Sequence, residues 1–257
     1  MNAAPVVVCE IAPWIVLVAF GSLSAAAAGW AVVLAERERD PLPVAACVGA
    51  LVCALNEPIY DLLGNITYAQ NHPMAFNALG RDIPWFLVLG YLPWVGLLPY
   101  LVARRMAAGV SRRSLHLLAL VSALSVVAVE LAGTAVGAWA YYGPAPLKYL
   151  VVAPQMAPVP VVGGFLLYTI AFGLTGWRRA LAGLVSATMA LPMVFAAASW
   201  PLYVGLNSDV GAPLAWMAGA AMLGLTVAMV VATTGLAQRW RRGELALAGV
   251  SGAGRES

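Results

Sequence analysis

The sequence predicts an all-α fold: a polytopic membrane bundle of seven transmembrane helices, with the N-terminus outside and the C-terminus in the cytoplasm. Three observations predict it. The chain is 62% hydrophobic and 10% charged, with a mean hydropathy of +0.86, which is too apolar for a soluble protein of 257 residues. Apolar runs of about 20 residues, the length that spans a bilayer, recur along the chain. Basic residues gather in alternate loops.

The apolar runs divide the chain into spans joined by short loops. The expected spans are residues 11–34, 43–63, 83–103, 115–137, 151–172, 180–204 and 213–237. The fifth is the most irregular, because the prolines of 153–160 interrupt it; it is either a broken helix or one that starts late, near Pro160. We therefore expect one integral-membrane helical domain over residues 1–257.

The basic residues set the orientation of these spans. Twelve of the 14 Lys and Arg residues fall in the first, third and fifth loops or after the last span, and only Arg81 and Lys148 fall on the other side. This positive-inside bias places the even loops outside the cell. The alternative for the first span is a cleaved signal peptide, but no basic residue precedes it. The basic loops indicate topology, so we expect no nucleic-acid partner.

Two carboxyl groups lie deep inside apolar spans. Glu57 is about 21 Å above Pro43 and Glu130 about 22 Å above Leu115, at 1.5 Å of rise per residue, on spans that run in the same direction. A carboxylate in hydrocarbon costs several kcal/mol unless it is paired, protonated or facing a polar cavity, so such residues often mark function. The equal depth predicts one shared cavity. The alternative is that each acid hydrogen-bonds across helices and only holds them together.

Further acids lie nearby, towards the outer ends of the spans. Asp61 follows Glu57 by four residues on the same helix face, and Asp209 precedes the last span. Both are catalytic candidates with Glu57 and Glu130; alternatively they are solvated caps at the interface. The longest outer loop, residues 64–82, is polar and could fold back over the outer mouth of the bundle.

These residue types suggest acid chemistry on an apolar substrate. Burial of a carboxyl group in an apolar pocket raises its pKa, so that it remains protonated and can act as an acid. Aromatic faces stabilise a developing cation. The candidates for these faces are Tyr60, Trp85, Tyr91, Trp94, Trp139, Tyr141 and Tyr142. Trp139, near a span end, also fits an interfacial aromatic belt.

Several classes of protein are excluded by what the sequence lacks. It contains no Walker A loop, no HExxH and no GxSxG nucleophile elbow. It has no DDxxD cluster for pyrophosphate-bound magnesium, and its two His residues are far apart, so we expect no metal and no cofactor. A rhodopsin is excluded because the single lysine, Lys148, lies in an outer loop.

The chain resembles the small integral-membrane terpene cyclases of fungal meroterpenoid and bacterial indolosesquiterpenoid pathways. The resemblance rests on the size, the seven spans, the acid of NEPIYD (Glu57) and the acid of LNSD (Asp209). It implies that a pair of acids, Glu57 and Asp209, protonates an epoxide or an alkene without metal. The stretch ELAGTAVGAWAYYG (130–143) is similar to membrane carotenoid cyclases and hydratases. Glu130 and Asp61 are additional to the two-acid pattern, which leaves the assignment of acid and base open.

The function expected from the sequence is therefore that of a multi-pass enzyme of the cell membrane, a cyclase that acts on a lipophilic isoprenoid by protonation. The lipid bilayer is its other expected partner. The alternative is a seven-helix transporter or small-ligand receptor without enzymatic activity. A transporter is expected to show repeat symmetry and acids that reach both leaflets, whereas the acids here lie on one side.

Overall fold

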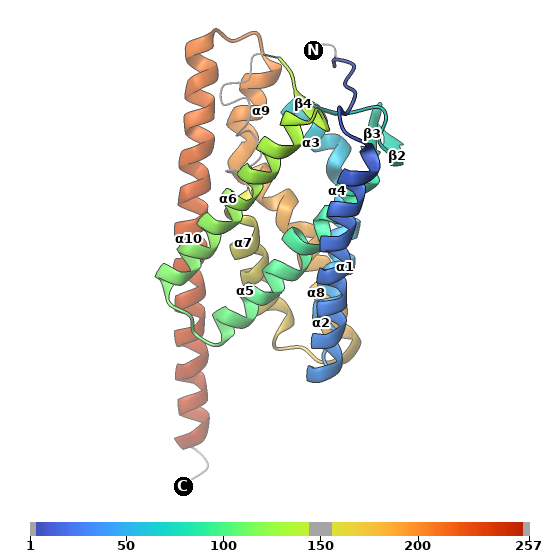
Figure 1. The fold of residues 1–257 in the computed structure, drawn as a ribbon. Coiled ribbons are helices and arrows are strands. Elements are labelled where there is room, and N and C mark those ends of the chain that lie inside the picture. The colour runs from blue at the N-terminus through green and yellow to red at the C-terminus, as the bar shows by residue number, and fades with distance from the viewer. Residues whose placement is uncertain (1–3, 144–155, 254–257) are drawn as a thin grey trace.

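The computed structural model describes residues 4–143 and 156–253 of the chain, which fold into a helical bundle (Figure 1). Six helical segments of the described residues are long and apolar enough to cross a membrane: Pro13–Glu38, Leu42–Gly64, Trp85–Ala107, Arg112–Ala135, Gly176–Asn207 and Ala212–Gly243. A shorter apolar helix, Val159–Ala171, lies between the fourth and fifth of them. The protein is thus a multi-pass membrane protein of predominantly helical structure.

Three of the six long segments are uninterrupted helices: α1 (Pro13–Glu38), α6 (Arg112–Ala135) and α10 (Ala212–Ala253). Each exposes large apolar side chains, for example Trp30 on α1, Leu120 on α6 and Val227 on α10. Apolar side chains that cover the outside of a helix bundle are stable against lipid and not against water. These three helices therefore face the membrane along much of their length.

The remaining segments are interrupted. The second long segment consists of α2 (Leu42–Cys53), the 3₁₀ turn η1 (Ala54–Asn56) and α3 (Glu57–Gly64). The third long segment consists of α4 (Trp85–Tyr91), the π-helical η2 (Leu92–Leu97) and α5 (Leu98–Ala107). The short helix comprises α7 (Val159–Leu166) and the π-helical η4 (Leu167–Ala171). The fifth long segment, Gly176–Asn207, comprises α8 (Gly176–Val194), the π-helical η5 (Phe195–Ser199) and α9 (Trp200–Asn207).

Prolines account for most of these interruptions. A proline has no backbone N–H, so the carbonyl four residues before it loses its helical partner and the helix locally changes pitch. Pro58 is the second residue after η1, and Pro201 is the second residue after η5. Pro93 lies within the π-helical η2, and Pro99 is the second residue after it. The interruptions matter because Glu57, Trp94 and Phe195, which line the cavity described below, lie in them or directly beside them.

Two small antiparallel ladders lie at the end of the bundle where α1 begins (Figure 1). In the first, β1 (Ile66–Tyr68) pairs with β4 (Trp139–Tyr141), which is remote in sequence. In the second, β2 (Met74–Ala78) pairs with β3 (Arg81–Pro84) through a tight turn at Leu79 and Gly80, both of which have positive φ. The N-terminal segment packs on the first ladder, because the N–H of Gln70 bonds to the Val7 carbonyl.

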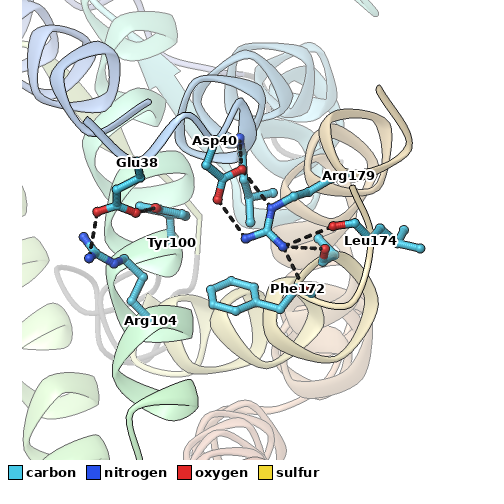
Figure 2. A network of polar contacts seen from close by, with 9 residues as sticks. Glu38, Asp40, Tyr100, Arg104, Phe172, Leu174 and Arg179 are labelled. Carbon is cyan, nitrogen blue, oxygen red and sulfur yellow. Dashed lines mark hydrogen bonds and ion pairs between the residues drawn. The ribbon is translucent and has the colours of Figure 1, made fainter. Parts of the chain in front are cut away.

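A polar network joins the helices at the opposite end of the bundle (Figure 2). Arg179, in the first turns of α8, forms a bidentate ion pair with Asp40, with distances of 2.8 and 2.7 Å. Its Nη1 also donates to the carbonyls of Ala171, Phe172 and Leu174, at the end of η4 and in the loop that follows it. Arg179 thereby ties the turn before α2 to the end of η4.

The structure agrees with most of the expected spans and corrects two points. The fifth expected span, 151–172, falls partly outside the described residues, and the helix described there begins at Val159, as the second alternative predicted. The two ladders were not predicted; the loop 64–82 contributes β1, β2 and part of β3. The polar outer loop does fold onto the end of the bundle, because its first strand pairs with residues that follow α6.

Candidate functional site

Two buried glutamates share one cavity between the helices. Glu57 opens α3 directly after the 3₁₀ turn, and Glu130 lies in the second half of α6. Their side chains are nearly closed off from solvent, with exposed fractions of 8% and 7%. The expectation of a shared cavity, based on equal depth in the membrane, is confirmed, since both residues line the same hollow.

The cavity contains about 780 Å³ of empty space, a volume that includes the space at its open side. Its walls are mainly apolar. Aliphatic side chains from α4, η2, α6 and α8 form much of the wall, and aromatic side chains surround the acids. The aromatic lining consists of Phe20, Tyr60, Tyr91, Trp94, Phe195 and Tyr203. Cavities of this kind, apolar with a few fixed polar groups, bind small lipophilic molecules.

Glu57 is held by two phenols. The hydroxyl of Tyr68 donates to its Oε1 at 2.9 Å, and the hydroxyl of Tyr91 donates to its Oε2 in a short hydrogen bond. Tyr91 reaches it from the last turn of α4 and Tyr68 from the outer ladder. A phenol can also accept a hydrogen bond, so both partners can accommodate Glu57 as a neutral acid as well as an anion.

Glu130 has a different pair of partners, and both bind the same oxygen. The indole N–H of Trp139 and the hydroxyl of Tyr141 each donate to Oε2 at 2.8 Å. An indole N–H can only donate, so Oε2 must act as an acceptor. Within the described part of the chain, Oε1 has no hydrogen-bond partner.

The β1–β4 ladder places three of these four donors. Side chains alternate between the two faces of a strand, so Tyr68 on β1 and Trp139 and Tyr141 on β4 point to one face, towards the acids. The register pairs Tyr68 with Trp139 and Ile66 with Tyr141. A ladder built from two loops therefore positions groups that bind both carboxyls.

Among the described residues, neither Glu57 nor Glu130 forms an ion pair with a cation. The salt bridges among the described residues, Arg104 with Glu38 and Arg179 with Asp40, lie at the opposite end of the bundle. The outer Arg81 donates instead to the Tyr142 hydroxyl at 2.5 Å. Burial, with the neighbouring carboxyl groups, raises the pKa of Tyr68 and of Tyr141 well above 10, so both phenols keep their protons.

A second, polar cavity adjoins the first at the end of the bundle that carries the two ladders, and Ile66 lines both. It has about 590 Å³ of empty space and is lined by the N-terminal segment, β1, and the β2–β3 hairpin. Asp61 lies at its buried end with an exposed fraction of 1%, whereas Gly80 and Asp82 on its rim are exposed. The side chain of Tyr68 lines this polar cavity, and its hydroxyl binds Glu57. A single phenol therefore lies between Asp61 and Glu57.

The structure brings together part of the predicted site. Glu57, Glu130, Tyr60, Tyr91 and Trp94 line the apolar cavity, and Trp139 binds Glu130 from its edge. Asp61 is placed in the adjoining polar cavity.

Three predicted site residues lie elsewhere. Asp209, which the family resemblance paired with Glu57, is exposed in the turn between α9 and α10 and does not line the cavity that contains Glu57. Trp85 points outward from the start of α4 with 47% exposed, and Tyr142 is turned towards Arg81. The position of a residue along a span predicts its depth in the membrane. The direction in which its side chain points depends on how the helices pack, which the sequence pattern does not give.

Sequence reasoning missed Tyr68 as a partner of Glu57, and Phe195 and Tyr203 as parts of the wall. Tyr141 was expected as an aromatic face and is found as a hydrogen-bond donor. The signal available for Tyr68 was the run Ile66-Thr67-Tyr68, which is β-branched and aromatic, follows a turn-forming asparagine and matches Trp139-Ala140-Tyr141 in its alternation.

Comparisons of the chain with protein-family models, with curated proteins and with solved structures give no match. The described residues contain no group of three or more His, Cys, Asp or Glu side chains that could hold a metal ion. What the site can do chemically is therefore argued from its geometry.

Proposed function

We propose that the protein is a membrane-embedded isoprenoid cyclase that protonates an epoxide or alkene of a polyprenyl-type substrate. The observation that carries the proposal is the shared apolar cavity with two buried carboxyl groups and a surrounding set of aromatic faces. A proton donor, a hydrophobic chamber and cation-stabilising rings are the three requirements of cyclisation that starts by protonation.

The different partners of the two carboxyls support distinct roles. Glu57 is bound by two phenols, which can accept a hydrogen bond from a protonated carboxyl as well as donate one, so it is assigned as the acid. Glu130 receives an obligatory indole donor and a phenol on one oxygen, an arrangement that suits a carboxylate, so it is assigned as the base. Neighbouring carboxyls in different environments are the usual arrangement of an acid–base pair.

The proposed reaction is an isomerisation and balances without a further reagent. Glu57 gives its proton to the epoxide oxygen or to an alkene carbon, and the C–O bond or the π bond breaks to leave a carbocation. Other double bonds of the chain attack this cation in turn and form the ring bonds. Glu130 removes a proton from the last cation, which restores a double bond. Faces of Tyr60, Trp94 and Phe195 stabilise the intermediate cations.

The proposal includes the membrane orientation: the N-terminus outside the cell, the C-terminus in the cytoplasm, and the plasma membrane as the location. The clustering of basic residues in alternate loops supports this orientation. The acids and both ladders then lie towards the outer leaflet, and a lipophilic substrate reaches the cavity from the bilayer.

The test is expression in hosts that produce polyprenyl quinones, polyprenyl epoxides or carotenoids, followed by mass spectrometry of the extracted lipids. We expect a product of unchanged mass and altered retention, absent with the Glu57→Gln variant. Glu36→Gln, at an exposed position of α1, is the matched control and should retain activity. Recovery of an unmodified lipid with the purified protein, without any product, would refute the cyclase and favour the receptor or carrier alternative.

A further inference from the structure

The polar cavity on the outer side has a feature that the cyclase proposal does not use. Both carboxylate oxygens of Asp61 are buried and lack a well-formed hydrogen bond among the described residues. A buried carboxyl without partners costs free energy, and in native structures such a group calls for an explanation. The surroundings of Asp61 supply this explanation. The polar cavity runs from Asp61 to the exposed rim at Gly80 and Asp82, so the carboxyl group faces a path to the surface.

Tyr68 links this carboxyl to the acid of the apolar cavity. Its hydroxyl donates to Glu57 Oε1 at 2.9 Å and also interacts with Asp61. A phenol carries one proton and two lone pairs, so it can donate to one carboxyl while it accepts from the other. Because its pKa is raised well above 10, Tyr68 is a neutral phenol at rest and can pass a proton on without being ionised beforehand.

We propose that Asp61 and Tyr68 form a proton relay that recharges Glu57 from the outer aqueous phase. The inference rests on the proposed function, since a cyclase acid that gives its proton to the substrate must regain one before the next turnover. In the step, the Asp61 O–H bond breaks as the Tyr68 oxygen takes that proton. The Tyr68 O–H bond breaks in turn as Glu57 Oε1 takes the other proton. Water in the outer cavity then reprotonates Asp61.

The charges around Asp61 are compatible with this path. Arg81 lines the same cavity from β3, and it is not in an ion pair with Asp61 among the described residues. A direct ion pair would hold Asp61 as an anion, whereas an unpaired carboxyl can take and give a proton. The titratable and charged groups whose fields reach Asp61 are Glu57, Tyr68, Arg81, Tyr141 and Tyr203.

The relay makes Tyr68 and Tyr91 different, although both bind Glu57. Tyr91 lines the apolar cavity and does not line the outer one. Removal of its hydroxyl should therefore leave proton exchange with the outer phase intact, while removal of the Tyr68 hydroxyl should block it. The pair forms a matched comparison on one carboxyl group.

Infrared spectroscopy of the protein in lipid nanodiscs tests the relay without any substrate. Glu57 is identified by the protonated-carboxyl C=O band that Glu57→Gln removes, and its shift is followed after a rapid change from H₂O to D₂O. We expect Tyr68→Phe and Asp61→Asn to slow this shift at least tenfold. Tyr91→Phe, and Asp82→Asn at the exposed rim, should leave it unchanged. Wild-type exchange rates in both relay variants, or no Glu57 band at all, would overturn the relay.

The two proposals fail in distinguishable ways. If the relay variants slow exchange but no host lipid is converted, the relay stands and the cyclase does not. If product forms while Tyr68→Phe leaves exchange unchanged, the cyclase stands and the relay does not. Where product forms, Tyr68→Phe should also complete a first turnover at the wild-type rate and then slow at least tenfold, because Glu57 starts out protonated. A retained elution profile and helical circular dichroism show that each variant is folded.

Discussion

Tyr68 and Trp139 are direct partners in the β1–β4 ladder, yet their side chains end on different carboxyl groups, Glu57 and Glu130. One three-residue ladder between two loops thus fixes both acids of the cavity. The acids come from different spans, so their relative position depends on this pairing.

The two glutamates should give different phenotypes when neutralised. Glu57→Gln keeps the shape of the side chain and removes the acid, so we expect a loss of substrate consumption of about 10²- to 10⁴-fold. Glu130→Gln removes the base, so substrate should still be consumed while the product pattern changes towards cations quenched by water. Quantitative mass spectrometry of substrate and products measures both. Identical losses of consumption in the two variants would contradict the assigned roles.

Gly133 is required by the close approach of Trp139. A Cβ at this position of α6 would overlap the indole ring, so Gly133→Ala should displace Trp139 and break its bond to Glu130. We expect a loss of about 1–3 kcal/mol in stability, typical of overpacking, together with lower activity. Thermal unfolding in detergent, followed by tryptophan fluorescence, measures the change. Gly224→Ala on α10, where a Cβ meets open space, is the control and should be neutral or slightly stabilising.

The Arg179 network should dominate stability at the end of the bundle remote from the cavity. Arg179→Ala leaves Asp40 without its cation and three carbonyls without their donor, so we expect a loss of about 3 kcal/mol. Arg179→Lys should restore only part of it, because an ammonium group lacks the planar fork. Arg178→Ala removes the exposed neighbour and should change the unfolding temperature little. Equal effects of Arg178→Ala and Arg179→Ala would show that the network is not stabilising.

The spans and the two acids could be predicted from the sequence, because hydropathy over about 20 residues and a carboxyl in an apolar run are local signals. The ladder could not. Its strands have three residues each, come from loops separated by two spans, and pair only once the helices are assembled. Trp85 and Trp94 illustrate a second limit: both are tryptophans of the third span, and only packing turns Trp94 into the cavity while Trp85 stays outside.

His72 should make the outer ladders sensitive to acid. It is buried beside the Phe86 ring, and burial lowers its pKa from 6.5. The unfolded chain therefore binds a proton below about pH 6.5 while the folded protein resists it, so stability falls as the pH drops. We expect thermal stability to decrease between pH 7.5 and pH 5 in the wild type and less in His72→Gln. A pH dependence in His72→Gln as steep as that of the wild type would contradict this role.

The orientation can be tested with reporters of sidedness. A reporter fused after Ala237 should be active in the cytoplasm, and one inserted at the turn formed by Leu79 and Gly80 should be active outside. Alkaline phosphatase and a fluorescent protein give opposite signals on the two sides. A cytoplasmic signal from the hairpin would reverse the proposed direction of the relay and the proposed orientation of the spans.

Residues 57–141 contain both acids and the four side chains that bind them, whereas α8, η5 and α9 supply only wall residues such as Leu191, Phe195 and Tyr203. The groups of the proposed proton chemistry are thus confined to one stretch of the chain, whereas the wall of the chamber is shared between that stretch and the later helices. The later helices can diverge, or be exchanged between related chains as a chimera, without replacing the acids or the side chains that bind them. A family built on this plan could diversify its products by mutating the later helices while it inherits one reaction.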